Sequence, residues 1–176
     1  PYEHPASIIA ALLQRHRLAQ VLFNLPLGDW AKGERGIAIL PDRVEEFRRG
    51  VDTAIDYAGQ LGCTQVNCLA GIAPAGVEAA VLENVFVENL RFAAERLKQA
   101  GIRLLVEPIN TIDIPGFFLN TSRQALALMD KVGSDNLYLQ YDIYHMQIME
   151  GDLARTIEKH LSRIAGGRLA AAAAQR

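Results

Sequence analysis

Short apolar runs alternate along the chain with longer segments in which apolar residues recur every three or four positions. The first pattern is typical of buried strands and the second of amphipathic helices. The apolar runs predict strands at residues 20–25, 65–69, 102–106 and 137–141. The periodic segments predict helices at residues 5–17, 43–61, 77–100, 121–131 and 152–164.

Residues that favour helix ends stand at several of these boundaries. Asp42, and either Thr121 or Ser122, are predicted N-caps, because their side chains accept hydrogen bonds from the free N–H groups of a first helical turn. Glycines that are predicted to end helices follow three of the segments: Gly62, Gly101 and Gly133.

The spacing of the predicted strands favours a parallel sheet. Their centres recur about every 35–45 residues, which is the length of one strand–helix unit and leaves room for a crossover connection. No two strands are joined by a hairpin signal. The strands are short and mostly apolar, as expected when helices cover the sheet.

Two α/β folds fit this order: an open doubly wound sheet and part of a (β/α)8 barrel. A Rossmann sheet should carry a GxGxxG motif after its first strand, and the chain has none. Polar residues gather instead where the strands end, namely Asn24, Glu107 with Asn110, and Asp142 with His145. Catalytic groups of a barrel collect at that rim. We therefore predict a partial (β/α)8 TIM barrel with about four parallel strands and outer helices.

Two acidic residues at strand ends are candidates for a metal centre. Glu107 directly follows a strand and precedes a proline, and Asp142 ends the next strand with His145 three residues later. Neighbouring strands lie about 4.8 Å apart, so both carboxylates can converge on one cation. Oxygen ligands suit Mg²⁺ or Mn²⁺, and a nearby histidine favours Mn²⁺ or Co²⁺. The pattern also fits simpler roles, with Asp142 as the N-cap of a following helix and His145 as a surface histidine.

Composition excludes several other classes of protein. The net charge of −2 gives no basic surface for nucleic acid. Cys63 and Cys68 form neither a CxxC motif nor a Cys/His cluster, so we expect reduced, structural thiols and a cytoplasmic location. No apolar run approaches the roughly 20 residues of a membrane span. The N-terminus has no signal-peptide pattern and no initiator methionine, so we expect the gene to start upstream.

Several segments resemble the hydroxypyruvate isomerase family, within the xylose-isomerase-like barrels. They are NLPLGDWAKGERGIA, QVNCLAG, LLVEPIN, FFLNTS and YDIYHMQIMEGDL, and the resemblance runs from Pro1 to about Ala165. It implies that Glu107 is both a metal ligand and an acid/base residue and that Asp142 is a second ligand. It also implies that His145 faces the substrate. Asn110, at the same rim, is a second candidate substrate-binding residue.

The chain departs from that family at both ends. The family has two strands before the segment that opens here as PYEHPAS, and later strands with a His-Val-Gln motif and a second catalytic glutamate. This chain has Gly166, Gly167 and Arg168 where His-Val-Gln should begin. We therefore expect residues 1–165 to be a partial barrel domain and residues 166–176 to be a non-native or frameshifted tail.

The resemblance implies a metal-dependent isomerase that interconverts hydroxypyruvate and tartronate semialdehyde, or a related short oxo-acid sugar, by enediolate proton transfer. The implied partners are a divalent metal (Mg²⁺ or Mn²⁺) and a small-molecule oxo-acid or sugar, with no nucleic acid and no membrane. Two alternatives stay open: a ketose 3-epimerase, and an inactive barrel fragment whose open edges leave room for a homo-oligomer. We expect little turnover from the 176-residue chain by itself.

Overall fold

The computed structural model describes residues 1–165, and the tail predicted at 166–176 lies outside the described residues. Its centre is a four-stranded parallel sheet in which the strands follow chain order, β1-β2-β3-β4. The strands are β1 (Phe23–Asn24), β2 (Gln65–Cys68), β3 (Arg103–Val106) and β4 (Leu137–Leu139). A doubly wound sheet reverses its strand order midway, and this sheet does not. The predicted partial barrel is confirmed.

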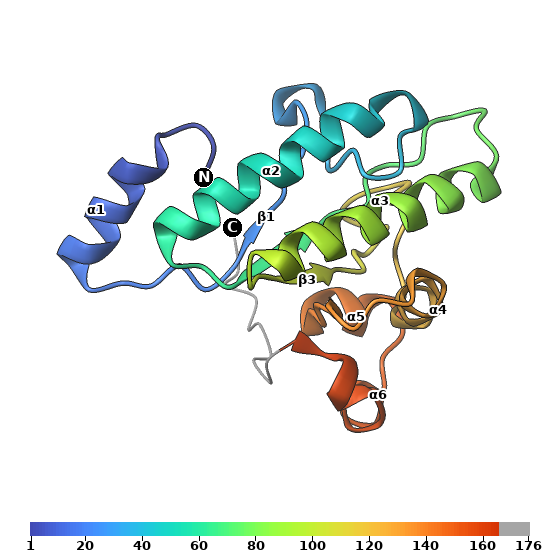
Figure 1. The fold of residues 1–176 in the computed structure, drawn as a ribbon. Coiled ribbons are helices and arrows are strands. Elements are labelled where there is room, and N and C mark those ends of the chain that lie inside the picture. Colours follow the sequence, from blue (N-terminus) through green and yellow to red (C-terminus); the bar gives the residue numbers. More distant parts are fainter. Residues whose placement is uncertain (166–176) are drawn as a thin grey trace.

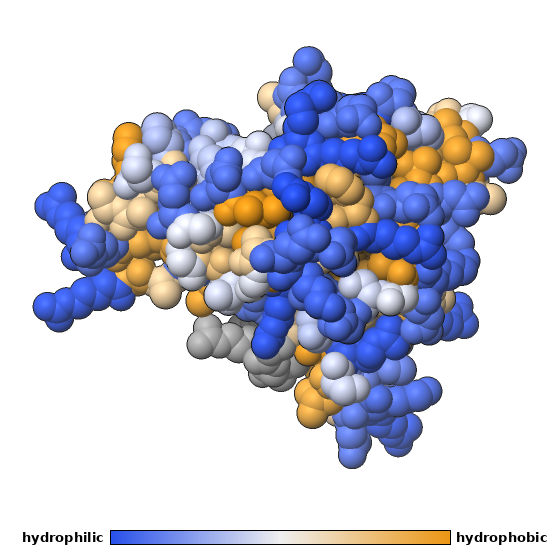
Figure 2. Space-filling view, viewed as in Figure 1, coloured by the Kyte–Doolittle hydropathy of each residue, from blue (hydrophilic) through white to orange (hydrophobic). Residues whose placement is uncertain are grey.

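In residues 1–165, six α-helices connect and cover the strands (Figure 1). They are α1 (Ala6–His16), α2 (Val44–Leu61), α3 (Ala79–Gln99), α4 (Ser122–Val132), α5 (Ile143–Met149) and α6 (Leu153–His160). In α2 the buried side chains recur every three or four residues, as at Phe47, Val51, Ala54 and Ala58, so one stripe of the helix packs on the core. Polar side chains dominate the outer surface over α2 and α3 (Figure 2). Within the described part of the chain, no helix has both the length and the apolar character to cross a membrane.

Two helix boundaries differ from the prediction. Asp42 is not an N-cap, because Pro41–Arg43 forms a separate 3-10 turn and α2 begins only at Val44. The segment predicted as one helix at 152–164 is α6 followed by a 3-10 turn at Leu161–Arg163. The predicted stop at Gly62 is confirmed, since this residue ends α2 with a positive φ of 64°.

The edge of the sheet beyond β4 continues at Ile164. This buried residue forms an isolated parallel bridge to Leu139 of β4. The bridge extends the sheet in chain order, as the next unit of a barrel would.

The loops that follow β1 and β2 touch through two glycines. A Cβ atom at Gly36 would lie 2.4 Å from the carbonyl oxygen of Leu69, and one at Gly71 would lie 2.4 Å from that of Gly36. Both residues have positive φ, 126° and 110°, so only glycine meets both demands. This contact ties together the loops at the carboxyl ends of the strands, where the candidate site lies.

Candidate metal centre

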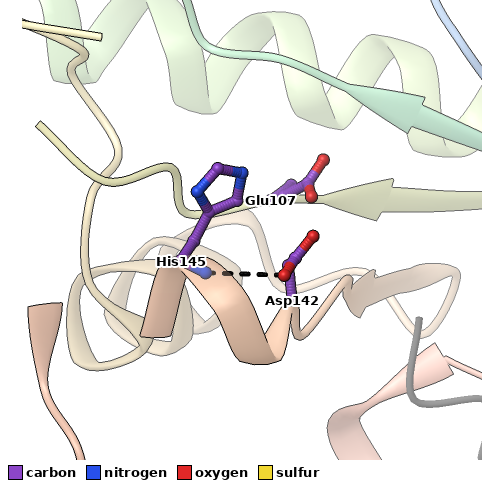
Figure 3. Close-up of side chains that lie close together, drawn as sticks. All are labelled: Glu107, Asp142 and His145. Atoms are coloured by element: carbon purple, nitrogen blue, oxygen red, sulfur yellow. Dashed lines mark hydrogen bonds between the residues drawn. The ribbon is translucent and has the colours of Figure 1, made fainter. Parts of the chain in front are cut away.

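Three titratable side chains meet at the carboxyl end of the sheet (Figure 3). Glu107 directly follows β3, Asp142 precedes α5, and His145 lies in the first turn of α5. One potential ligand atom from each lies within 4.8 Å of the others. The structure therefore brings the two predicted metal ligands together, with His145 beside them.

Asp142 occupies the N-cap position of α5. Its Oδ1 accepts hydrogen bonds from the backbone N–H groups of Tyr144, at 2.7 Å, and of His145, at 3.4 Å. All of its side-chain hydrogen bonds to described residues use this one oxygen. The N-cap role and the ligand role were alternatives in the sequence. In the structure they are compatible, because Oδ2 stays available to a cation.

Glu107 is a partly buried carboxylate with an unusual acid strength. Burial, and next the negative charge of Asp142, raise its pKa to about 7, although a hydrogen bond from Asn67 acts in the opposite direction. That bond joins Asn67 Nδ2 to Glu107 Oε2 at 2.7 Å. A cation between the two carboxylates would relieve both the repulsion and the loss of water.

Asn67 is a site residue that sequence reasoning missed, because its place within a strand suggested simple packing. Its side chain is 1% exposed, and its Nδ2 also donates to Asn24 Oδ1 at 3.0 Å. Asn67 Oδ1 is buried and has no hydrogen-bond partner among the described residues. A signal was present, since Asn24 was already recognised as polar at a strand end and pairs in register with Asn67.

Asn110 and His145, the two residues that the sequence predicts to bind the substrate, lie side by side. Asn110 Nδ2 is 2.8 Å from His145 Nδ1. Burial lowers the pKa of His145, which favours the neutral form of the ring. Asn110 itself is fully buried, and its amide is bonded to protein groups on both sides. Its geometry is that of a residue that positions its neighbours.

The donor set fits a divalent cation. Two carboxylates supply the hard oxygen ligands that Mg²⁺ and Mn²⁺ prefer. A cation between them would offset their mutual repulsion. Six-coordinate ions of this kind commonly keep several water or substrate ligands. Glu107 and Asp142 are thus sufficient to begin a site but not to complete one.

Comparisons with known proteins support the barrel fold. A family model described as "Xylose isomerase-like TIM barrel" matches residues 1–172. The hydroxypyruvate isomerase of Escherichia coli (strain K12) is 51% identical over 164 residues, which cover 93% of this chain and 64% of that protein. The 2-oxo-tetronate isomerase of Cupriavidus necator is 43% identical, over 93% of this chain and 63% of that protein. The chain therefore spans somewhat less than two thirds of these relatives.

Solved structures give the same picture of the fold. The crystal structure described as "AP endonuclease, family 2" from Brucella melitensis matches with a TM-score of 0.90 and 45% identity, over 93% of this chain and 63% of that one. A structure of L-ribulose 3-epimerase matches with a TM-score of 0.73 and 26% identity, over 93% and 54% of the two chains.

Proposed function

Because the chain belongs to the xylose isomerase-like TIM barrel family, we propose that it forms most of a metal-dependent isomerase acting on a short oxo-acid sugar. The proposed reaction interconverts hydroxypyruvate and tartronate semialdehyde. The observation that carries the proposal is the meeting of Glu107, Asp142 and His145 at the carboxyl rim of the sheet. The names of the two relatives that are 51% and 43% identical support the substrate class.

The reaction moves a proton between two adjacent carbons. A C–H group next to a carbonyl is weakly acidic, and its removal places negative charge on the neighbouring oxygens. A divalent cation held by Glu107 and Asp142 would supply the positive charge that these oxygens need. Mg²⁺ and Mn²⁺ are the ions we propose, because carboxylate oxygens suit both.

Glu107 is the proposed base that removes the proton. A carboxylate positioned beside the substrate can take up the proton and return it. Asn67 holds Oε2 in place, so the orientation of the carboxylate is fixed before the substrate arrives. His145 is the proposed donor to a substrate oxygen. The second carboxylate on the opposite face of the substrate, expected from the resemblance, stays a prediction, as do the homo-oligomer and the lack of a nucleic-acid partner.

A ketose 3-epimerase is the second candidate, supported by the match to L-ribulose 3-epimerase. Both reactions begin with removal of a proton next to a carbonyl group. An isomerase returns the proton to the adjacent carbon, whereas a 3-epimerase returns it to the same carbon from the opposite face, on a longer sugar. The higher identity to the hydroxypyruvate and 2-oxo-tetronate isomerases favours the short oxo-acid.

The test is a coupled assay of the full-length protein with hydroxypyruvate, psicose and fructose, each with Mg²⁺, Mn²⁺ or a chelator. We expect turnover of hydroxypyruvate that depends on the added metal. Preferential turnover of psicose or fructose would replace the proposal by the epimerase, and equal rates with the chelator would remove the metal from it. The 176-residue chain assayed alone tests the remaining alternative of an inactive fragment.

A further inference from the structure

Four hydrogen bonds determine which way the amide of Asn110 faces. Its Oδ1 accepts from the backbone N–H groups of Ile112, at 3.1 Å, and Asp113, at 2.8 Å. Backbone N–H groups only donate, so the atom facing them must be the amide oxygen. The amide nitrogen therefore faces the other way, where it meets Asp113 Oδ2 at 2.9 Å and His145 Nδ1 at 2.8 Å.

This orientation determines the tautomer of His145. The amide nitrogen carries two hydrogens, one for the Asp113 carboxylate and one for the ring, so His145 Nδ1 has to accept. The backbone N–H of Asn110 also points at the same ring atom, at 3.5 Å. A neutral imidazole whose Nδ1 accepts carries its proton on Nε2.

We propose that Asn110, anchored by Asp113, is a positioning residue that holds His145 as the Nε2–H tautomer. His145 then donates a hydrogen bond to a substrate oxygen and does not act as a third metal ligand. The inference rests on the proposed function for the identity of the acceptor. The tautomer itself follows from the hydrogen bonds of the protein alone.

Asp113 also joins the loop after β3 to helix α5. Its Oδ2 accepts a second hydrogen bond, from the hydroxyl of Tyr144 at 2.8 Å. Tyr144 precedes His145 in α5, and the two rings lie 5.3 Å apart between centroids. The carboxylate of Asp113 thus fixes both the amide that contacts the imidazole and the helix that carries it.

The test exchanges the amide of Asn110 and the carboxylate of Asp113, so that the donor and the acceptor of their hydrogen bond change places. In the double variant Asn110→Asp/Asp113→Asn, the carboxylate at 110 still accepts from the two backbone N–H groups and from the new amide at 113. It can no longer donate to His145 Nδ1. We expect the ring proton to move to Nδ1 while the protein stays folded.

The tautomer is read from long-range ¹H–¹⁵N spectra of the ¹⁵N-labelled full-length protein, without metal and with diamagnetic Mg²⁺. The wild type should show protonated Nε2 in both states, and the double variant protonated Nδ1. Asn120→Asp, in the same loop but without contact to His145, is the matched control and should keep the wild-type pattern. In the isomerase assay kcat should fall about 10–100-fold in the double variant, as for other outer partners of site residues.

Three results would overturn the inference: protonated Nδ1 or a cationic ring in the wild type, an unchanged tautomer in the double variant, or loss of the Nε2 proton when Mg²⁺ is added. A wild-type protein with the expected tautomer but no isomerase activity would instead defeat the proposed function alone. The two failures are therefore distinguishable.

Discussion

The two carboxylates of the candidate metal centre are held in different ways. Glu107 stands at the end of a buried strand and receives its hydrogen bond from Asn67, a side chain inside the sheet. Asp142 stands at the start of a seven-residue helix and is held by backbone N–H groups of that helix. The first arrangement alters acid strength, because burial raises the pKa of Glu107 to about 7. The second arrangement fixes the direction in which the Asp142 carboxylate points. A strand end and a helix start can therefore supply one site with a carboxylate of altered acid strength and a carboxylate of fixed orientation.

The largest effect should come from removing the carboxylate of altered acid strength. In the full-length protein, Glu107→Gln keeps the size of the side chain but removes the charge that accepts a proton and binds a cation. We expect turnover of hydroxypyruvate to fall about 10²–10⁴-fold, as for the loss of a positioned acid/base. The control is Glu95→Gln on the exposed face of α3, which should retain normal activity. Undiminished turnover by Glu107→Gln would exclude Glu107 from the mechanism.

The raised pKa of Glu107 predicts a pH dependence of stability in the metal-free protein. The folded state binds the Glu107 proton more tightly than the unfolded state does. Burial of Glu107 therefore does not lower the free energy of unfolding below about pH 4.5, where the group is protonated in both states, and lowers it fully above about pH 7. The full cost corresponds to about 3 kcal/mol. The free energy of unfolding contributed by this residue should therefore decrease as the pH rises from 5 to 8.

Urea unfolding of wild type and Glu107→Gln across this pH range measures the contribution. His145 acts in the opposite direction, because its lowered pKa reduces stability as the pH falls, but this effect is common to both proteins. The difference between them should change by up to about 3 kcal/mol between pH 5 and pH 8. A constant difference would show that Glu107 is not a buried, weakened acid. Added Mg²⁺ should reduce the change, because a cation stabilises the charged form.

The part of the site that the strands position was only half predictable from the sequence. Glu107 and Asp142 could be placed together because each follows an apolar run at the same register of successive strand–helix units. Asn67 could not be placed in the site, because no local feature of an asparagine in a strand shows whether its side chain only packs or also binds a carboxylate. The deciding fact is the contact with Glu107, 40 residues away in the chain.

The part of the site that helix α5 positions was even less predictable from the sequence. Helix α5 has seven residues, fewer than periodicity needs, and the strand prediction at 137–141 ran past the real end of β4 at Leu139. Asn110 was correctly placed at the rim, but its hydrogen bonds depend on a loop that folds back on itself and on a ring 35 residues away. Long loops leave such pairings open until the tertiary structure is known.

A third prediction concerns the support of Glu107. Asn67→Ala removes the donor to Glu107 Oε2 and leaves Asn24 Oδ1 without its partner. We expect about 1–3 kcal/mol less stability, the usual cost of a buried polar group that loses its partner, together with weaker binding of Mn²⁺. Asn89→Ala is the matched control, because Asn89 is equally buried but donates to the backbone of Ala38, away from the site. It should lose stability without loss of Mn²⁺ affinity in a calorimetric titration. Equal Mn²⁺ affinity in the two variants would mean that Asn67 only packs.

The smallest effect separates the two roles of Asp142. Asparagine caps helices about as well as aspartate, whereas alanine costs about 1 kcal/mol. Asp142→Asn should therefore keep the stability of the wild type in urea unfolding, and Asp142→Ala should lose about 1 kcal/mol through the missing bonds to Tyr144 and His145. Mn²⁺ binding should decrease in both variants, because neither supplies a second charged oxygen. Unchanged Mn²⁺ affinity in both variants, with loss of stability in Asp142→Ala only, would make Asp142 a structural cap alone. Since one oxygen makes all the cap bonds, we expect the two effects to separate, with stability following the cap and affinity following the charge.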